Sequence, residues 1–226
     1  MYAKFFKRVM DFTLSLIALL CLSPILLVLI IVGAAGMRGN PFFTQQRPGK
    51  DERIFKLIKF RTMTNQKDKD GNLLPDDKRL TGYGKFLRAT SLDELPELIN
   101  ILTGDMSIVG PRPQLVRDMT FMNAEQRRRH SVRPGLTGLA QVSGRNNITW
   151  ERKFEYDLQY IDDGITFLGD MKIIFMTVWK VLKRSDTVRE GTVSDMDFGD
   201  WLIMEGKIDK ETYDAKQAEA RERLKV

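Results

Sequence analysis

Residues 12–37 read FTLSLIALLCLSPILLVLIIVGAAGM, an uncharged run of 26 residues with Ser23-Pro24 close to its middle. A helix needs about 20 apolar residues to cross a bilayer, so this run is long enough to do so. Proline removes a backbone donor and clashes with the preceding turn, and it therefore kinks or breaks a helix. The run predicts a membrane-embedded helix that is interrupted at Ser23 and Pro24.

Basic residues flank this run on both sides, with Lys4, Lys7 and Arg8 before it and Arg38, Arg47 and Lys50 after it. Positive charge marks the cytoplasmic side of a membrane segment. The simplest prediction for residues 1–40 is a helix–break–helix that enters and leaves the membrane by the same face. A single kinked span and a signal peptide are the alternatives, although the run exceeds the usual h-region of about 7–15 residues.

The rest of the 226-residue chain is long enough for one domain with its own core. A net charge of +6 and a pI of about 9.4 fit attraction to anionic lipid head groups and to phosphorylated substrates. The single cysteine, Cys21, excludes a disulfide framework and a cysteine-based zinc site. No motif for nucleic acid is present, so we expect no such partner. His130 follows three arginines, and we expect it at a solvated helix end.

The pattern along the chain predicts a mostly helical α/β domain. Strands are expected over 42–45 and 54–63, and glycine- and proline-bounded loops over 104–113 and 133–145. Helical spacing covers 83–102, 115–130, 154–161 and 165–184. The last of these either packs into the core or lies in the membrane interface with Trp179 at head-group level. The predicted division is a membrane segment over 1–40, a catalytic domain over 41–185 and a charged extension over 186–226.

Two acidic residues, Asp93 and Glu94, begin a predicted helix directly after Ser91. The structural interpretation is a capping box between Ser91 and Glu94, with Asp93 complementing the helix dipole. The functional interpretation is that cations such as Arg88 depress the pKa of Asp93, so that it stays ionised as a nucleophile or as a ligand for a hard cation.

Several cations could bind phosphate near these acids. Arg112 stands between Pro111 and Pro113, and this rigid turn lowers the entropy lost when its guanidinium binds phosphate. Lys59 and Arg145 add further positive charge on strand and loop positions. A nucleophilic acid among such cations, tethered to a membrane, suggests phosphoryl transfer onto or from a lipid. The rival hypothesis is a non-catalytic, membrane-tethered binder of polyanions, which leaves the proline-bounded arginine unexplained.

Four motifs in order give the chain a specific resemblance: KFRTM (59–63), SLDELPEL (91–98), GDMSIVGPRP (104–113) and RPGLTG (133–138). They resemble the bacterial sugar transferase domain of the monotopic polyprenyl-phosphate phosphoglycosyl transferases. The resemblance runs from about residue 1 to residue 184. The resemblance is strongest to the small members of this family, such as the enzymes that start bacterial N-linked glycosylation.

The resemblance implies an α/β fold with a re-entrant helix broken at Ser23-Pro24, on the cytoplasmic face of the bacterial inner membrane. It implies that Asp93 attacks the phosphate next to the sugar of a UDP-sugar, with Mg²⁺ assisting, and that UMP leaves. Polyprenyl (undecaprenyl) phosphate then takes the phosphosugar. Glu94 would orient the metal, together with Asp93, or serve as base toward the acceptor. Downstream glycosyltransferases are candidate partners. The expected substrate-binding residues are Lys59, Arg88, Arg112 and Arg145.

Overall fold

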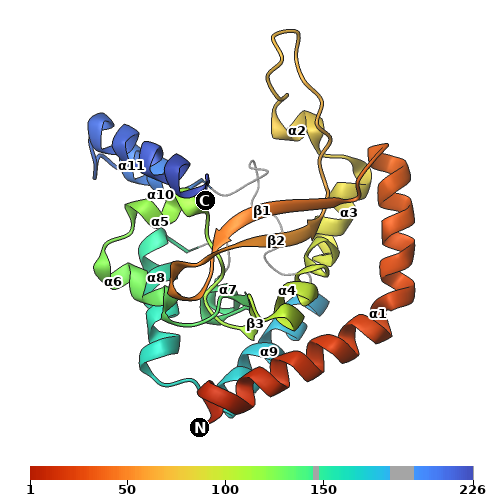
Figure 1. The fold of residues 1–226 in the computed structure, drawn as a ribbon, viewed down its shortest axis with the longest axis vertical. Helices are drawn as coiled ribbons and strands as arrows, with labels where there is room; N and C mark the ends of the chain where they lie inside the picture. Colours follow the sequence, from red (N-terminus) through yellow and green to blue (C-terminus); the bar gives the residue numbers. More distant parts are fainter. Residues whose placement is uncertain (145–147, 184–195, 226) are drawn as a thin grey trace.

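The structure of the chain, a computed structural model, describes residues 1–144, 148–183 and 196–225 (Figure 1). Helices predominate, and two small sheets lie among them. The elements in chain order are η1 (Tyr2–Phe6), α1 (Lys7–Met37), β1 (Phe42–Pro48), η2 (Lys50–Glu52), β2 (Ile54–Phe60), α2 (Asp76–Arg79), α3 (Gly82–Thr90), η3 (Leu92–Glu94), α4 (Glu97–Thr103), β3 (Ser107–Val109), α5 (Val116–Phe121), α6 (Ala124–Arg127), η4 (Arg128–Ser131), β4 (Gly135–Thr137), α7 (Leu139–Ser143), α8 (Trp150–Asp162), α9 (Phe167–Lys183), α10 (Phe198–Met204) and α11 (Lys210–Arg223).

The N-terminal apolar run forms one continuous helix, α1, which contains Pro24. The Ser23 hydroxyl donates to the carbonyl oxygen of Leu20 at 2.7 Å. This is the carbonyl that residue 24 would bond if proline had an N–H. Figure 1 shows α1 bent near its middle. The predicted interruption is therefore a bend within one helix rather than a break between two, because the serine hydroxyl satisfies the carbonyl that the proline leaves without a partner.

The length and composition of this N-terminal helix suit a bilayer. Among the residues that the structure describes, one helix, Tyr2–Met37, is long and apolar enough to cross a membrane. Its most apolar 18-residue window has a mean hydropathy of 3.0, and only 11% of that window is buried inside the protein. A soluble core helix of this composition would be mostly buried. The length, composition and exposure of α1 are thus compatible with association with a membrane.

Both arms of α1 contact the rest of the protein. In the first arm, the buried Asp11 carboxylate accepts from the Ser107 hydroxyl at 2.7 Å and from the Ile108 amide at 3.0 Å. In the second arm, the carbonyl oxygen of Leu29 accepts from the Tyr83 hydroxyl at 2.8 Å, and the Leu29 side chain packs against a core that includes Phe60. One stripe of the helix therefore holds the domain along its length, while many apolar side chains of the other faces stay exposed.

The predicted strands are confirmed as the hairpin β1–β2. The two strands are antiparallel, with Phe42 opposite Phe60 and Pro48 opposite Ile54, and Gly49 with η2 closes the turn. The strands extend slightly differently from the expectation, since β1 runs on to Pro48 and β2 ends at Phe60. The hairpin matters for the site because β2 carries the half-buried Lys59, which lines the cleft described below.

The two segments expected as loops contain regular structure. Residues 104–113 include β3 and residues 133–145 include β4, which pair in parallel, and α7 follows β4. The glycines in these segments allow close backbone approach rather than irregular structure. A Cβ atom on Gly110 would lie 2.5 Å from the Arg133 carbonyl oxygen, and one on Gly135 would lie 2.1 Å from the Gly110 nitrogen. The prediction of loops was wrong because glycine served a packing role here.

The single helix predicted over 115–130 is instead three short pieces, α5, α6 and η4. Asn123 starts α6 with a capping box, because its side chain accepts from the Gln126 amide while the Gln126 side chain accepts from the Asn123 amide, both at 2.9 Å. His130 is 6% exposed, so the expectation of a solvated histidine was wrong. Burial and the neighbouring Arg129 charge lower its pKa to about 3, and it is neutral near pH 7.

Helix α9 combines the two interpretations left open for 165–184. Ile173 is buried in a core cluster with Val109 and Tyr160. The outer face exposes large apolar side chains, among them Phe175, Trp179 and Leu182. One face of α9 therefore packs on the protein, and the other offers an apolar surface of the kind that lies in a membrane interface. The start of α9 is joined to the start of α1, since Asp170 pairs with Lys7 at 2.6 Å.

Candidate active site

The Asp93-Glu94 pair lies at a sharp reversal between α3 and α4. Helix α3 ends at Thr90, and Ser91 adopts a left-handed conformation with φ of 56°. The following turn, η3, carries both acids. Ser91 therefore ends one helix rather than starting the next, and its side chain makes no cap hydrogen bond to η3. The predicted capping box between Ser91 and Glu94 was wrong, because the chain turns at Ser91 before it resumes a helix.

Glu94 is bound by two cations from distant segments. Its Oε1 atom accepts from Lys59 Nζ of β2 at 2.8 Å and from Arg112 Nη2 of the loop after β3. The second guanidinium nitrogen of Arg112 lies 3.5 Å from Glu94 Oε2. Lys59 also pairs with the buried Glu97 at the start of α4, at 3.1 Å. The predicted phosphate-binding cations Lys59 and Arg112 thus hold an acid of the candidate site in place.

These contacts set the charge of the neighbouring acids. Burial alone would raise the pKa of Glu94, but the charges of Arg112 and Lys59 hold it well below its ordinary value. The pKa of Glu97 is raised to about 7, chiefly by burial and against the charge of Lys59. The negative charge of Glu94 raises the pKa of Arg112. Glu94 is therefore fixed as an anion whose charge is already balanced.

Asp93 differs from its neighbour in both contacts and charge. Within the described chain, its carboxylate makes no hydrogen bond and no ion pair, and it feels the neighbouring charges only through space. Burial, followed by the negative charge of Glu94, raises its pKa to about 6. The predicted depression of this pKa was wrong, because burial and Glu94 outweigh the nearby charges of Lys59, Arg112 and Arg88. Asp93 is still mostly ionised near pH 7, and it is more basic than an ordinary carboxylate.

Both acids lie in a cleft of about 1030 Å³. Arg88 lines it beside Asp93, and its Nε atom donates to the Thr62 hydroxyl at 3.2 Å. One wall is apolar and comes from α9, which contributes Ile174, Val178 and Val181. The cations that line the cleft are Arg47, Lys59, Arg61, Arg79, Arg88, Arg112, Arg117 and Lys153. Such a cleft is suited to a polyanionic ligand that also contacts the apolar wall of α9.

The structure brings together five of the predicted substrate-binding and acidic positions, Lys59, Arg88, Asp93, Glu94 and Arg112, and adds new ones. Arg145 lies outside the described residues. Sequence analysis missed Arg47, Arg117 and Gln141 as lining residues of the cleft. The side-chain amide of Gln141 is buried there with neither its nitrogen nor its oxygen hydrogen-bonded in the described chain. No sequence signal distinguished these residues, because their approach to the acids depends on how β1, α5 and α7 pack.

A metal site built by the protein alone is not present among the described residues, where no group of three or more histidine, cysteine or acidic side chains could hold an ion. Asp93 offers a carboxylate without a hydrogen bond, whereas Glu94 already faces two cations. Mg²⁺ is commonly bound through one or two carboxylates together with substrate phosphates. The acids present therefore fit an ion that binds together with a phosphorylated ligand.

Comparison with known proteins defines the class of this chain. The family model described as "Bacterial sugar transferase" matches residues 2–184. The chain is 49% identical over 176 residues to the uncharacterized sugar transferase EpsL of Bacillus subtilis, covering 78% of this chain and 87% of that protein. It is 44% identical over 190 residues to a UDP-glucose:undecaprenyl-phosphate glucose-1-phosphate transferase of Klebsiella pneumoniae, covering 77% of this chain but 40% of that protein. The chain is thus an enzyme of the transferase class. It belongs to the bacterial sugar transferase family.

The paired contact between Arg112 and Glu94 makes a first prediction. In Arg112→Lys, an ammonium group cannot span both carboxylate oxygens, so Glu94 loses part of its support and the cleft loses a guanidinium. We expect sugar-transfer activity to fall by about tenfold or more, the effect of losing a charged hydrogen bond. Arg152→Lys is the matched control, because Arg152 pairs with Glu155 on the exposed face of α8. Near-normal activity of folded Arg112→Lys would contradict the role of the guanidinium.

Proposed function

We propose that this enzyme transfers a sugar 1-phosphate from a UDP-sugar to a polyprenyl phosphate, namely undecaprenyl phosphate. Asp93 would act as the covalent nucleophile. The family and the names of related proteins support the general reaction. A related protein from Escherichia coli, 40% identical over 188 residues, is named UDP-glucose:undecaprenyl-phosphate glucose-1-phosphate transferase. The product would remain in the membrane, where other glycosyltransferases could extend it.

The observation that carries this proposal is the different state of two adjacent acids. Glu94 is bound by Lys59 and Arg112, whereas Asp93 has a carboxylate free of hydrogen bonds in the described chain and a pKa raised to about 6. A nucleophile needs an available lone pair and gains reactivity with basicity. Asp93 meets both conditions, and Glu94 meets neither. The guanidinium groups around Asp93 suit the negative charge that develops on transferring phosphoryl oxygens.

In the first step, an Asp93 carboxylate oxygen would attack the phosphorus that bears the sugar. A bond forms between this oxygen and phosphorus, and the bond from phosphorus to the bridging oxygen of the diphosphate breaks. UMP leaves with that oxygen and its electron pair, and the sugar phosphate remains on Asp93 as a mixed anhydride. Arg88 and Arg112, which line the cleft beside Asp93, would bind the diphosphate oxygens.

In the second step, a phosphate oxygen of polyprenyl phosphate would attack the same phosphorus. The bond between phosphorus and Asp93 breaks, the free carboxylate returns, and polyprenyl-diphosphate-sugar is the product. The acceptor phosphate is an anion at neutral pH and needs no strong base. Glu94 would act here by fixing Lys59 and Arg112, so we assign it the role of a positioning residue.

Mg²⁺ fits this site as a partner of Asp93 and of the donor diphosphate. When bound, it would neutralise charge on the diphosphate oxygens and on the departing UMP. The chain's own residues would orient the donor and hold the arginines in the cleft.

We also propose that α1 enters and leaves the membrane by its cytoplasmic face in a bacterial inner membrane. The support is that both arms of α1 contact the same domain, through Asp11 in one arm and Leu29 in the other. A helix that crossed the bilayer would carry one of these arms away from a domain on a single side. The apolar outer face of α9 would lie in the same interface, so that the α9 wall of the cleft receives the lipid acceptor.

Variant Asp93→Asn tests the covalent step. An amide cannot form the phosphosugar adduct, and we expect turnover to fall by roughly 10³-fold or more while the protein stays folded. Incubating the wild type with labelled UDP-sugar and Mg²⁺, without acceptor, should label the peptide that contains Asp93 and release UMP. Asp105→Asn, on an exposed loop, is the matched control. An active preparation with no adduct and sequential rather than ping-pong kinetics would exclude the covalent mechanism.

The raised pKa of Asp93 makes a pH prediction. The attacking carboxylate must be ionised, so the rate of the first half-reaction should rise with pH through about 6 and level off above it. An ordinary aspartate would give this limb near pH 4. Removing the Glu94 charge in Glu94→Gln should shift the limb to lower pH, because that charge raises the pKa of Asp93. A limb near pH 4 in the wild type, or one that does not move in Glu94→Gln, would show that Asp93 is not the titrating nucleophile.

Cysteine labelling tests the topology. Cysteines placed at Ala3 and Asn40, in a Cys21→Ser background, should both be shielded from an impermeant reagent added outside intact inner-membrane vesicles of native orientation. Both should react once the membrane is permeabilised, which is the control for their accessibility. Labelling of only one of the two positions in intact vesicles would favour a full span over the same-face geometry.

A further inference from the structure

The C-terminal part of the chain adds a wall to the cleft. The family match ends at residue 184, and of the residues beyond it the structure describes 196–225. These form α10 and α11, which pack against α5 on the side of the protein away from α1 (Figure 1). Met196 and Asp197, just before α10, line the same cleft as Asp93. This segment, residues 196–225, is called the C-terminal strap below.

The beginning of the strap is fixed to the cleft walls by specific contacts. The Phe198 amide donates to the buried Asp118 carboxylate at 2.9 Å, and the Trp150 indole N–H donates to the Met196 carbonyl oxygen at 3.3 Å. The backbone of Gly199 lies against the Phe121 ring, since a Cβ atom there would be 2.5 Å from a ring carbon. The position of Asp197 in the cleft is therefore set by the contacts of its two neighbours, Met196 and Phe198.

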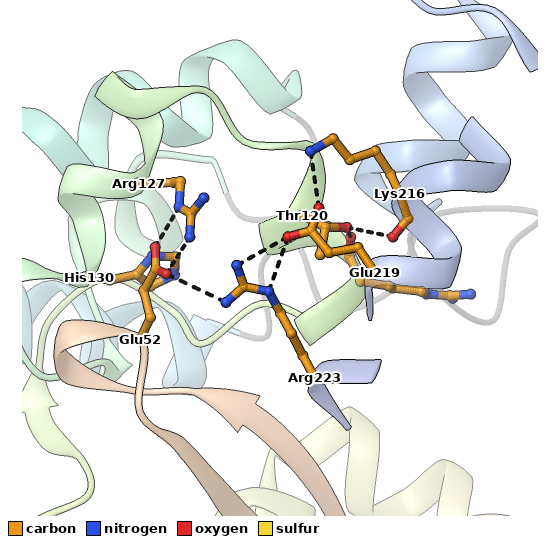
Figure 2. A network of polar contacts seen from close by, with 8 residues as sticks. Glu52, Thr120, Arg127, His130, Lys216, Glu219 and Arg223 are labelled. Carbon is orange, nitrogen blue, oxygen red and sulfur yellow. Dashed lines mark hydrogen bonds and ion pairs between the residues drawn. The ribbon is translucent and has the colours of Figure 1, made fainter. Parts of the chain in front are cut away.

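The far end of the strap is held by a second set of contacts. Figure 2 shows Arg223 of α11 between two carboxylates, with Glu219 at 3.1 Å and Glu52 of the β1–β2 turn at 3.9 Å. The Thr120 hydroxyl of α5 donates to the Lys216 carbonyl oxygen at 3.2 Å. The two helices of the strap are themselves joined, because the Tyr213 hydroxyl donates to the Asp200 carboxylate at 2.5 Å. The strap is thus attached to the domain at both ends.

Within the cleft, the strap makes one ion pair with the catalytic domain. Asp197 pairs with Arg117 of α5, and both residues line the cleft. The Arg117 side chain remains 43% exposed, so the ion pair leaves much of it accessible. Arg117 also stands close enough to Arg47 to affect its charge. The pKa of Arg47 is lowered to about 10, mainly by burial, next by the charge of Arg112 and to a smaller extent by the charge of Arg117. Arg112, Arg47 and Arg117 therefore gather along the cleft.

We propose that Arg117, anchored by Asp197 of the strap, binds the phosphate groups of the UDP-sugar donor. Arg117 lies on α5, away from the apolar α9 wall that suits the lipid acceptor. A guanidinium held by a carboxylate on one side presents its remaining N–H donors in a fixed direction, which favours binding of phosphate oxygens. Asp197 is then a positioning residue that acts through Arg117. This inference rests on the proposed function, because it assigns a residue to the donor of that reaction.

The test is the affinity of the full-length protein for UDP, measured by titration calorimetry in detergent, for the wild type, three single variants and one double variant. Arg117→Ala should weaken UDP binding by about tenfold or more, as expected for a charged hydrogen bond. Asp197→Asn should weaken it by about threefold, because Arg117 must then be immobilised on binding. The double variant should bind no more weakly than Arg117→Ala, since Asp197 acts through Arg117. Asp200→Asn, which alters the strap outside the cleft, should bind UDP like the wild type.

Steady-state kinetics separate the donor from the acceptor. The KM for UDP-sugar should rise in Arg117→Ala in parallel with the UDP affinity, while kcat and the KM for polyprenyl phosphate change by less than about twofold. Arg117→Lys, which keeps the charge, should give an intermediate effect and serves if the alanine variant does not fold. Thermal denaturation of each variant checks its fold.

Three results would overturn the inference. They are an unchanged affinity for UDP in folded Arg117→Ala or Arg117→Lys, tighter binding in Asp197→Asn, and an effect on the KM of the acceptor alone. Tighter binding in Asp197→Asn would show that the carboxylate only masks the charge of Arg117. A wild type that neither binds UDP nor releases UMP would instead contradict the proposed function, so the two failures are distinguishable.

Discussion

The active region depends on Glu94 accepting from Lys59 and Arg112 together. These three residues come from β2, from η3 and from the loop after β3, which are far apart in the sequence. Two cations in a largely buried cleft would repel each other without an anion between them, and an acid buried there would protonate without its cations. Glu97 adds a second acid to Lys59 at 3.1 Å. These ion pairs hold β2, η3 and the loop after β3 together, and they keep Arg112 at the cleft.

The same arrangement explains why the two adjacent acids differ in their contacts and in their pKa values. Glu94 uses its oxygens on cations, and its charge acts on Asp93 through space. Asp93 is left with an available carboxylate whose pKa is raised to about 6 rather than lowered. A dipeptide in one short turn thus contains one acid that holds two cations and one acid that the proposed mechanism can use as a nucleophile. Exchanging the two acids would not be neutral, because only the position of Glu94 reaches both Lys59 and Arg112.

The sequence predicted those features that depend on local pattern. The apolar run, the β1–β2 hairpin and helices α8 and α9 follow from composition and periodicity, and all are present. The bend at Pro24 was predicted as a break. The prediction considered the proline alone and not the Ser23 hydroxyl, which donates to the Leu20 carbonyl oxygen and so supports the helix. Strands β3 and β4 were missed because each is only three residues long and their pairing partner is distant in sequence.

The candidate site was predicted in part for the same reason. The sequence motifs predicted five site residues, and the structure puts all five around one cleft: Lys59, Arg88, Asp93, Glu94 and Arg112. The sign of the Asp93 pKa shift depends on burial, which no local pattern encodes. Arg117 and Asp197 are 80 residues apart, so their pairing appears only when α10 packs on α5.

The position of the cleft relative to the membrane follows from how α1 is held. Lys7, Asp11 and Ser15 are buried at intervals of four residues, and Leu29 and Gly33 repeat that spacing in the second arm. Such spacing puts them on one stripe of a helix, which leaves the remaining circumference exposed and apolar. Because polar members of the stripe contact β3 and α9, the domain cannot tilt away from α1 without exposing buried charge. In the proposed membrane arrangement, the depth of α1 would therefore set the height of the α9 wall, where a lipid acceptor would enter. The C-terminal strap would lie on the far side, toward a water-soluble donor.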